Sequence, residues 1–333
     1  MPSDRLVLST RMAVSVVALA AVTVAFLAGV WLIFYGALLA AGFGGAAPIA
    51  GLVTVATLLC IGFLEYHQRE TIERMADAHP VDREAAPELY RVATRVAAQL
   101  DVPAPAIAVS PRSAPEATLV GLCPRSMHLV LSTGTLDALE DPAELEAVIA
   151  HELAHVANRD GMVMTAISLP VVLADGVRSR ITAFENPGWF VVVIVPLGLV
   201  STVVLLVGRF LTAHLSRARE RAADRAVIDV TGSPAALASA LARLDRSIAE
   251  TPDRDLRAVS GISSLSILPL EPAELEKVML GPEGDVEPSF WWLRARLHRL
   301  ERRFFGTHPP TANRIEALSA SASIRDGPRT ELS

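Results

Sequence analysis

The five consecutive residues His151-Glu152-Leu153-Ala154-His155 combine side chains that hold a metal ion with one that moves a proton. On a helix, residues four apart share a face, so both imidazoles can reach one ion. Glu152 lies on a neighbouring part of that face, close enough to act as a general base. Chance produces this pattern in about one chain in a hundred of this size. The residues around the motif must therefore give independent support for a metal site.

The residues before this motif predict the helix that it needs. Asp141 is a good N-cap, Pro142 suits the first helical position, and Glu144 completes a capping box. The helix is expected to run to about Asn158, which places the motif in its second half. Apolar neighbours supply a side for packing against a core: Val148, Ile149 and Val156.

A catalytic zinc usually has three protein ligands and one open position, so a third ligand is expected downstream on another helix. Residues 216–230 are helical by propensity and end near Gly232. Glu220 and Asp224 lie four apart on one face of that segment. Glu220 is suited to ligate the ion, and Asp224 to accept a hydrogen bond from a ligating histidine. Alone, the pair is typical of a solvated acidic face among arginines; the preceding motif favours the metal.

The composition predicts a membrane protein: 51% of the residues are hydrophobic and the mean hydropathy is +0.40. Residues 12–64 contain no acidic residue, lysine, arginine or histidine. A crossing needs about 20 apolar residues, so two spans are expected, at 12–41 and about 49–64, around a turn at Gly42–Pro48. The run is too long for the apolar region of a cleaved signal peptide, which favours an anchor.

Two further apolar stretches follow the motif. Residues 186–208 carry no charge and are long enough to cross. Residues 162–174 are short for a span, and both a crossing helix and a buried or re-entrant helix stay open for them. Arginine density after 186–208 marks the cytoplasmic side: Arg209, Arg217, Arg219, Arg221 and Arg225.

The remaining polar sequence predicts a divided soluble part. Residues 65–100 are interpreted as helical. Short strands at 107–110, 119–122 and 128–132 indicate a small sheet, and an edge strand near 128–132 is suited to hold an extended peptide. The expected organisation has two spans, a first peptidase part, two membrane segments, a second peptidase part and a disordered tail: 1–64, 65–160, 161–210, 211–320 and 321–333. No role is assigned to 251–288.

Charge and cysteine content exclude other classes of protein. A net charge of −6 does not suggest a nucleic-acid partner. The two cysteines, Cys60 and Cys123, are too few for a disulfide framework. A reduced, cytosol-facing soluble part fits this usage.

Three ordered blocks resemble the signature blocks of the HtpX-type membrane metallopeptidases, relatives of the CAAX prenyl endopeptidases: HELAHVANRD (151–160), SRARERAAD (216–224) and THPPTANRI (307–315). The resemblance covers nearly the whole chain. It implies one zinc ion per chain, held by His151, His155 and Glu220, with Glu152 as the base. The fold class it implies is a mainly α integral membrane protein with about four membrane helices and a cytosolic α+β, gluzincin-type peptidase domain.

The resemblance also implies a multi-pass protein of the plasma membrane whose active site faces the cytoplasm. Its substrates would be unfolded or damaged membrane polypeptides. Asn158 and Asp160 match the first block and are interpreted as supporting the ligands from the end of their helix. The chain departs from its relatives at residues 116–118, where Glu-Ala-Thr replaces a frequent Asn-Ala-Phe, which leaves the substrate preference open.

The third block contains two residues with alternative interpretations. His308 is suited to reach the metal as a temporary fourth ligand, to donate to an oxyanion, or simply to order a proline turn. Arg314 is suited to pair with an acid of the site or to bind a substrate carbonyl. Two other functions stay open beside the quality-control endopeptidase: a CAAX-type processing peptidase and a zinc-binding membrane scaffold without catalysis. The oligomeric state is not predicted.

Overall fold

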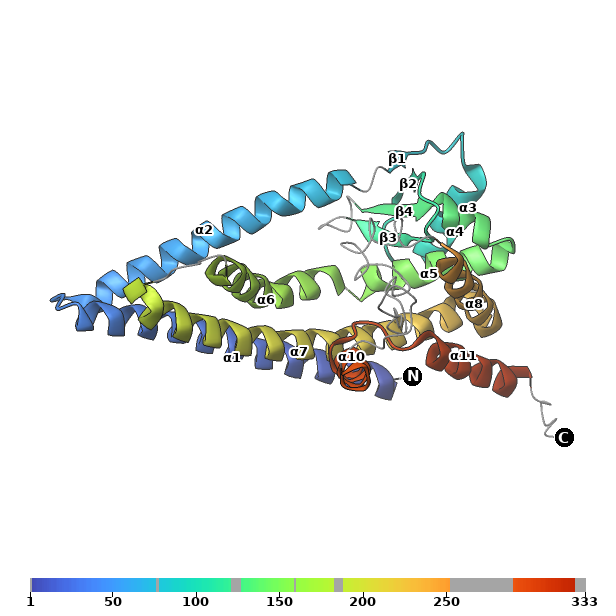
Figure 1. Ribbon diagram of the computed structural model, residues 1–333. Helices are drawn as coiled ribbons and strands as arrows, with labels where there is room; N and C mark the ends of the chain where they lie inside the picture. Colours follow the sequence, from blue (N-terminus) through green and yellow to red (C-terminus); the bar gives the residue numbers. More distant parts are fainter. Residues whose placement is uncertain are drawn as a thin grey trace, which may run out of the picture. The chain divides into compact units, whose positions relative to one another are not determined.

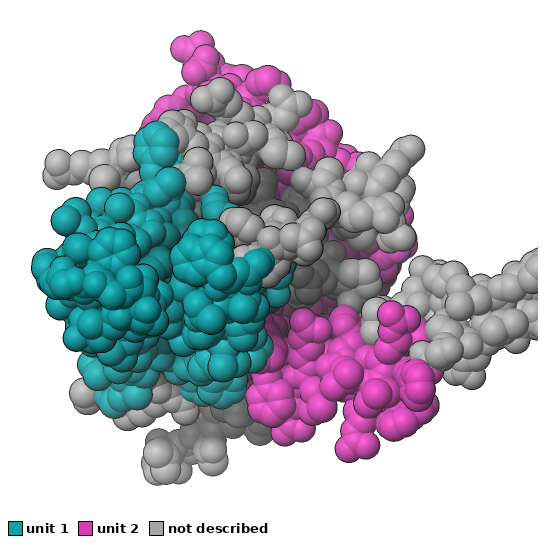
Figure 2. Space-filling model, turned by 60° about the vertical axis from the view of Figure 1, so that its left-hand side comes forward, with its two compact units in different colours: residues 1–75, 162–215 teal, residues 76–161, 216–333 magenta. Residues whose placement is uncertain are grey.

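The computed structural model describes residues 2–75, 78–120, 127–158, 160–182, 188–251 and 290–326 (Figure 1). The chain forms two compact units, and each is assembled from two separate stretches (Figure 2). The first unit contains residues 1–75 and 162–215, and the second contains residues 76–161 and 216–333. The last stretch of the second unit, 216–333, therefore follows the whole of the first unit in the sequence.

The first unit begins with two long helices, α1 (Pro2–Ala40) and α2 (Ala46–Met75), which pack against each other. The turn between them was predicted, and two of its glycines explain its tightness. Gly42 and Gly45 have φ values of 79° and 78°, in the left-handed region that glycine enters without steric cost.

The first unit is completed by α6 (Asp160–Thr182), a short 3₁₀ helix (Gly188–Phe190) and the beginning of α7 (Val191–Thr231). Helices α6 and α7 approach closely at Gly208, where an added Cβ would lie 2.5 Å from a methyl group of Val171. The core of this unit contains apolar side chains from all four helices: Phe26, Val30, Ile61, Ala174, Val177, Leu197 and Val204.

Three helices in the described part of the chain are long and apolar enough to cross a membrane: Ala13–Ala40, Ala46–Phe63 and Gly188–Thr231. Their outer surfaces are apolar as well; Leu52 is 73% exposed and Leu199 is 66% exposed. Such apolar surfaces are unfavourable in water and favourable in contact with lipid acyl chains. The side chains of residues 160–169 lie outside the described part, so a crossing by α6 stays a prediction.

The second unit contains a four-stranded sheet in the order β1-β2-β4-β3. Its strands are β1 (His79–Pro80), β2 (Ala106–Ser110), β3 (Ala117–Val120) and β4 (His128–Ser132). β2 and β4 are parallel, and the other pairs are antiparallel. The three longer strands were predicted, but the prediction that β4 is an edge strand is wrong. β4 lies between two neighbours, and β3 is the edge among the described strands.

Helices α3 (Pro87–Gln99), α4 (Thr133–Ala138), α5 (Pro142–Ala157), α8 (Pro234–Glu250), α10 (Trp291–Phe305) and α11 (Thr311–Asp326) complete the second unit. The region predicted as helical over 65–100 is interrupted by β1. Residues 252–289 and 327–333 lie outside the described part, whereas residues 321–326 of the predicted tail are helical. One core joins sheet and helices: Ile107, Leu129, Leu131, Ile149, Leu153, Leu237 and Leu241.

Helix α5 begins and ends where the sequence predicted. Asp141 caps it by accepting a hydrogen bond from Ala143 N at 2.8 Å, and Asn158 is its C-cap. The predicted capping box is not formed. The carboxylate of Glu144 instead accepts a hydrogen bond from Ser239 on α8 and pairs with Arg243. A tertiary partner has taken the side chain that a local cap would have used.

Candidate metal centre

Helix α5 directs its two histidines toward a single point. The ring of His151 lies 5.0 Å from that of His155, and the two planes are nearly perpendicular at 89°. His151 is fully buried, and Glu152 beside it is 2% exposed. Ile149 and Leu153 of the same helix are packed in the core. Because this packing fixes the rotation of α5, it also fixes the direction of the two imidazoles.

Glu220 on α7 meets the two histidines. Its Oε2 lies 3.3 Å from Nε2 of His151, and its Oε1 lies 3.7 Å from Nε2 of His155. One ligand atom from each residue lies within 4.8 Å of the other two. Tetrahedral zinc with bonds of about 2.0–2.1 Å places its ligand atoms about 3.4 Å apart. The separations of 3.3 Å and 3.7 Å between Glu220 and the two histidines are close to that value.

Behind the histidine, Asp224 and Arg314 form a buried ion pair. Oδ1 of Asp224 lies 3.1 Å from Nδ1 of His151. Arg314 on α11 donates two hydrogen bonds to Asp224, at 3.0 Å from Nε and 2.6 Å from Nη2, and its Nη1 lies 3.3 Å from Oε2 of Glu220. The guanidinium is 3% exposed. Of the two interpretations of Arg314, the structure therefore supports the pairing with acids of the site.

The site is strongly polarised by its own charges. Burial lowers the pKa of His151, but the adjacent carboxylates of Asp224 and Glu220 outweigh burial and raise that pKa to about 9. Burial raises the pKa of Glu152 to about 8, against the opposing charge of His151. The negative charges of Asp224 and Glu220 favour either a proton on His151 or a metal cation among the ligands.

Unsatisfied buried atoms support a metal at this place. Among the described residues, Nε2 of His151, Oε1 of Glu152 and Oε2 of Glu220 have no partner in hydrogen-bonding geometry. Polar atoms buried in this way are costly unless a ligand satisfies them. Two imidazoles and one carboxylate are also the donor set of a catalytic zinc site. The residues present therefore fit a zinc ion.

His308 lies at the same cluster. Its Nδ1 is 3.6 Å from Oε1 of Glu220, and its side chain is 3% exposed. Neither of its nitrogens has a hydrogen-bond partner among the described residues. The structure thus places Nδ1 of His308 beside the carboxylate of Glu220.

Two other residues of the first block have no demonstrated place in the cluster. Asn158 ends α5, and its backbone N–H donates to the carbonyl of Ala154 at 3.0 Å. Its side chain makes no hydrogen bond to the ligands in the part of the chain that the structure describes. Asp160 begins α6, but its side chain lies outside the described residues. Their supporting role stays a prediction.

Glu116, where the chain departs from its relatives, is a buried acid. It is 2% exposed, and its carboxylate lies 3.5 Å from Arg112. Burial raises the pKa of Glu116, and Arg112 opposes that rise. Its backbone is held from the other side, by Ser132 and Thr135. The role of Arg112 was not foreseen, although its position four residues before Glu116 was a signal for pairing.

Comparisons with known proteins agree with this geometry. Residues 83–322 match the model of peptidase family M48. Protease HtpX homolog 2 of Methanosarcina acetivorans is 34% identical over 254 residues, which cover 74% of this chain and 83% of that protein. Protease HtpX homolog 1 of Streptomyces coelicolor is 36% identical, with 72% of each chain covered.

Protease HtpX homolog of Moorella thermoacetica is 33% identical and covers 84% of this chain and 94% of its own. Among solved structures, S. mikatae Ste24p is similar with a TM-score of 0.43 at 16% identity, over 80% of this chain and 56% of that one; nothing is concluded from that likeness. The matched family region contains both histidines, Glu152 and Glu220. The chain therefore belongs to peptidase family M48, as an HtpX-like membrane protease.

Proposed function

We propose that this protein is a zinc endopeptidase of the plasma membrane that hydrolyses unfolded or damaged membrane proteins on the cytoplasmic side. The observation that carries the proposal is the meeting of His151, His155 and Glu220 around one point, with Glu152 on the same helix face. A buried carboxylic acid beside a three-ligand site is the arrangement that metal-assisted peptide hydrolysis requires.

His151, His155 and Glu220 would hold the zinc ion. When bound, zinc supplies a Lewis acid that polarises the scissile carbonyl and makes a water more acidic. Asp224 keeps His151 oriented by facing its Nδ1, and Arg314 keeps Asp224 in place through two hydrogen bonds. This chain of contacts leaves Nε2 of His151 facing Glu220, where it would be free to hold the ion.

Glu152 would take the proton from the attacking water and return it to the leaving amine. Its buried position beside the ligands would keep both proton transfers away from bulk water. His308 would donate a hydrogen bond to the oxygen that becomes negative during attack. Its burial beside Glu220 with two unengaged ring nitrogens supports that assignment.

The edge strand β3 would bind the substrate backbone. Ser132 N donates to Glu116 O at 2.9 Å, so the backbone groups of Glu116 face β4. Because antiparallel strands alternate, the backbone groups of Ala117 and Leu119 point away from β4. β3 also contacts α5. A peptide added to this edge would be held by its backbone beside the metal ligands, with little dependence on its sequence.

The cytoplasmic orientation is supported by the arginines that follow the uncharged part of α7, since basic residues beside a span stay inside. They are Arg209, Arg217, Arg219, Arg221 and Arg225. A backbone-reading site tethered to the bilayer is suited to segments that have lost their fold, because only unfolded segments expose an unpaired backbone. That combination motivates the assignment to damaged membrane proteins.

The proposal is tested by metal content and activity on the detergent-purified full chain, wild type beside Glu220→Ala. We expect about one zinc per chain in the wild type, by mass spectrometry, and none in the variant. A fluorescein-labelled, unfolded protein should be cut only by the wild type. Zinc retained without Glu220 would place the third ligand elsewhere.

The two alternative functions separate in the same preparation. A prenylated CAAX peptide cut in preference to the unfolded protein would indicate a processing peptidase. Zinc present without hydrolysis of either probe would indicate a scaffold. The orientation is tested in sealed, oriented vesicles by adding substrate to one side at a time. Only substrate added on the side of the peptidase unit should be cut.

A further inference from the structure

Helix α10 (Trp291–Phe305) takes no part in the metal centre, and none of its residues is buried. A helix of a folded domain normally buries an apolar stripe against its core. Instead, α10 displays large apolar side chains together with an excess of positive charge. Its fifteen residues contain one acid, Glu301, and five arginines: Arg294, Arg296, Arg299, Arg302 and Arg303.

The two sides of α10 differ in their environment. One side is half-buried, at the spacing of a single helix face: Trp291, Ala295, His298, Arg302 and Phe305. The roughly opposite side carries a second regular row, which we name the apolar stripe: Leu293, Leu297, Leu300 and Phe304. These four side chains are 38%, 55%, 42% and 45% exposed. Their spacing of three and four residues makes one continuous surface along the helix.

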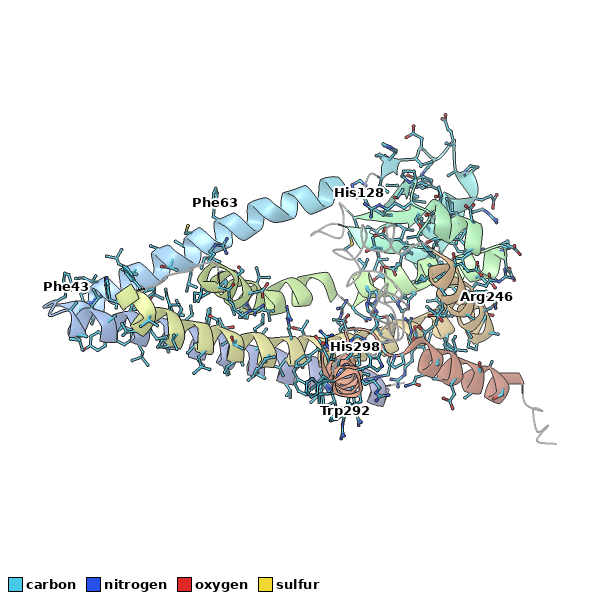
Figure 3. The ribbon with its side chains drawn as sticks, in the orientation of Figure 1. Phe43, Phe63, His128, Arg246, Trp292 and His298 are labelled. Atoms are coloured by element: carbon cyan, nitrogen blue, oxygen red, sulfur yellow. The ribbon has the colours of Figure 1, made fainter. Side chains whose placement is uncertain are left out.

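Charged and aromatic residues border the apolar stripe. By helical rotation, Arg296 and Arg303 lie along one of its edges and Arg294 lies near the other. At the beginning of the helix, Phe290 is 70% exposed and Trp292 is 65% exposed. Trp292 and His298 lie on different sides of α10 (Figure 3). A narrow apolar row with arginine borders and a tryptophan end is typical of helices that lie in the interface of a bilayer.

The end of α10 is tied to the helix that leaves the membrane. Nη1 of Arg217 on α7 donates a 2.7 Å hydrogen bond to the carbonyl of Gly306, directly after α10. Arg217 lies nine residues beyond Gly208, the last residue of the uncharged stretch of α7 (208 to 217). At a rise of about 1.5 Å per residue, this separation is roughly 14 Å along α7. The tie therefore joins the end of α10 to the part of α7 that follows the uncharged stretch.

We propose that α10 lies in the headgroup layer of the membrane, with the apolar stripe between the acyl chains and its arginines on anionic lipid headgroups. The net positive charge of α10, five arginines against one acid, selects a negatively charged surface as the occupant. A bilayer that contains anionic lipid offers both an apolar layer and a negative surface. The membrane spans of the same chain keep that surface permanently close.

The test uses the full-length protein in vesicles. In a Cys60→Ser/Cys123→Ser background, spin labels are placed on the apolar stripe (Leu297→Cys), on the exposed polar side beyond its arginine border (Arg299→Cys) and on the half-buried side (Ala295→Cys). Collision rates with oxygen, which concentrates in acyl chains, and with a water-soluble nickel chelate are then measured. We expect the oxygen-to-nickel ratio at residue 297 to be several-fold higher than at residue 299.

Vesicles of phosphatidylglycerol and phosphatidylcholine are compared with phosphatidylcholine alone, and the ratio at residue 297 should fall in the neutral vesicles. A label at residue 297 that meets nickel freely would overturn the proposal, because the stripe would then face water. Exclusion of both reagents would overturn it as well, since protein would cover the stripe. An equal ratio in both vesicle types would overturn the role of anionic lipid. If Leu297→Cys lowers the melting temperature, Leu300→Cys replaces it.

Discussion

Helix α5 buries a titratable residue near its beginning and another in its second half, and the two clusters around them are completed in different ways. Glu144 near the first end is paired with Ser239 and Arg243, and the side chain of Arg243 is still 38% exposed. At the other end, Glu220, Asp224 and Arg314 surround His151, and no side chain among these four is more than 11% exposed. The first cluster reaches water, and the second is closed.

This difference separates a structural tie from a reactive site. Water relieves the charges of an ion pair that has one exposed member, so such a pair contributes modestly to stability. Water does not reach the charges of a closed cluster. Its unsatisfied polar atoms therefore destabilise the fold unless a bound ion satisfies them. Comparable residues on one helix should therefore respond very differently to substitution.

The largest effect is expected from Glu152→Gln. Removal of a general base lowers turnover by about 10²- to 10⁴-fold, while zinc content and melting temperature should stay as in the wild type. Steady-state hydrolysis of the labelled unfolded protein measures the loss. Glu144→Gln, at the other end of α5, is the matched control and should retain turnover. Activity within a factor of a few of wild type would remove Glu152 from the mechanism.

The next largest effect is expected from Arg314→Met. The substitution leaves Asp224 and Glu220 buried without their counter-ion, which costs about 3–5 kcal/mol. Chemical denaturation in detergent measures the change in the free energy of unfolding. Arg314→Lys keeps the charge but loses the paired hydrogen bonds to Asp224, so its loss should be smaller. Equal losses for the two variants would contradict a role for the double hydrogen bond.

Metal removal should have an intermediate effect. If zinc binds only the folded state, a free concentration near a hundred times its dissociation constant stabilises the protein by about 3 kcal/mol. Chelation should therefore lower the melting temperature of the wild type. The melting temperature of Glu220→Ala should not respond to the chelator. A response of the same size in both proteins would locate the stabilising metal outside this cluster.

The smallest effects are expected at the solvent-exposed cluster around Glu144, Ser239 and Arg243. Glu144→Gln should cost about 1–2 kcal/mol, since it weakens buried hydrogen bonds but keeps the shape of the side chain. Glu140 pairs with the same Arg243 at 3.3 Å but is 77% exposed, so Glu140→Gln should cost about 0.5 kcal/mol or less. Both variants should retain zinc. Loss of zinc from either one would erase the distinction between the two ends of α5.

Local signals in the sequence predicted α5 well, because its cap, first-turn proline and histidine spacing all act within a few residues. The same local reasoning failed for Glu144, whose partner Ser239 is 95 residues away. It also placed β4 at the edge of the sheet. Alternation of side chains defines a strand but not its neighbours, and β3 inserts at the edge although it precedes β4 in the chain.

The candidate site shows the same division. Residue types and spacing, together with the family resemblance, predicted the cluster of His151, His155 and Glu220. The partner of Arg314 stayed open, because Asp224 is 90 residues earlier and only the packing of the helices brings the two together. Arg112 was missed because the burial of Glu116 cannot be read from its neighbours in the chain.

The division of the second unit into two stretches also sets the order in which the enzyme is made. His155 is synthesised 159 residues before Arg314 (155 to 314). At about 5–20 residues per second, the growing chain carries the two histidines for roughly 8–30 s before the last member of the cluster emerges. The membrane-spanning candidate in α7 is synthesised during the same interval. The carboxylates of Asp224 and Glu220 therefore have no Arg314 guanidinium to pair with until synthesis is nearly complete.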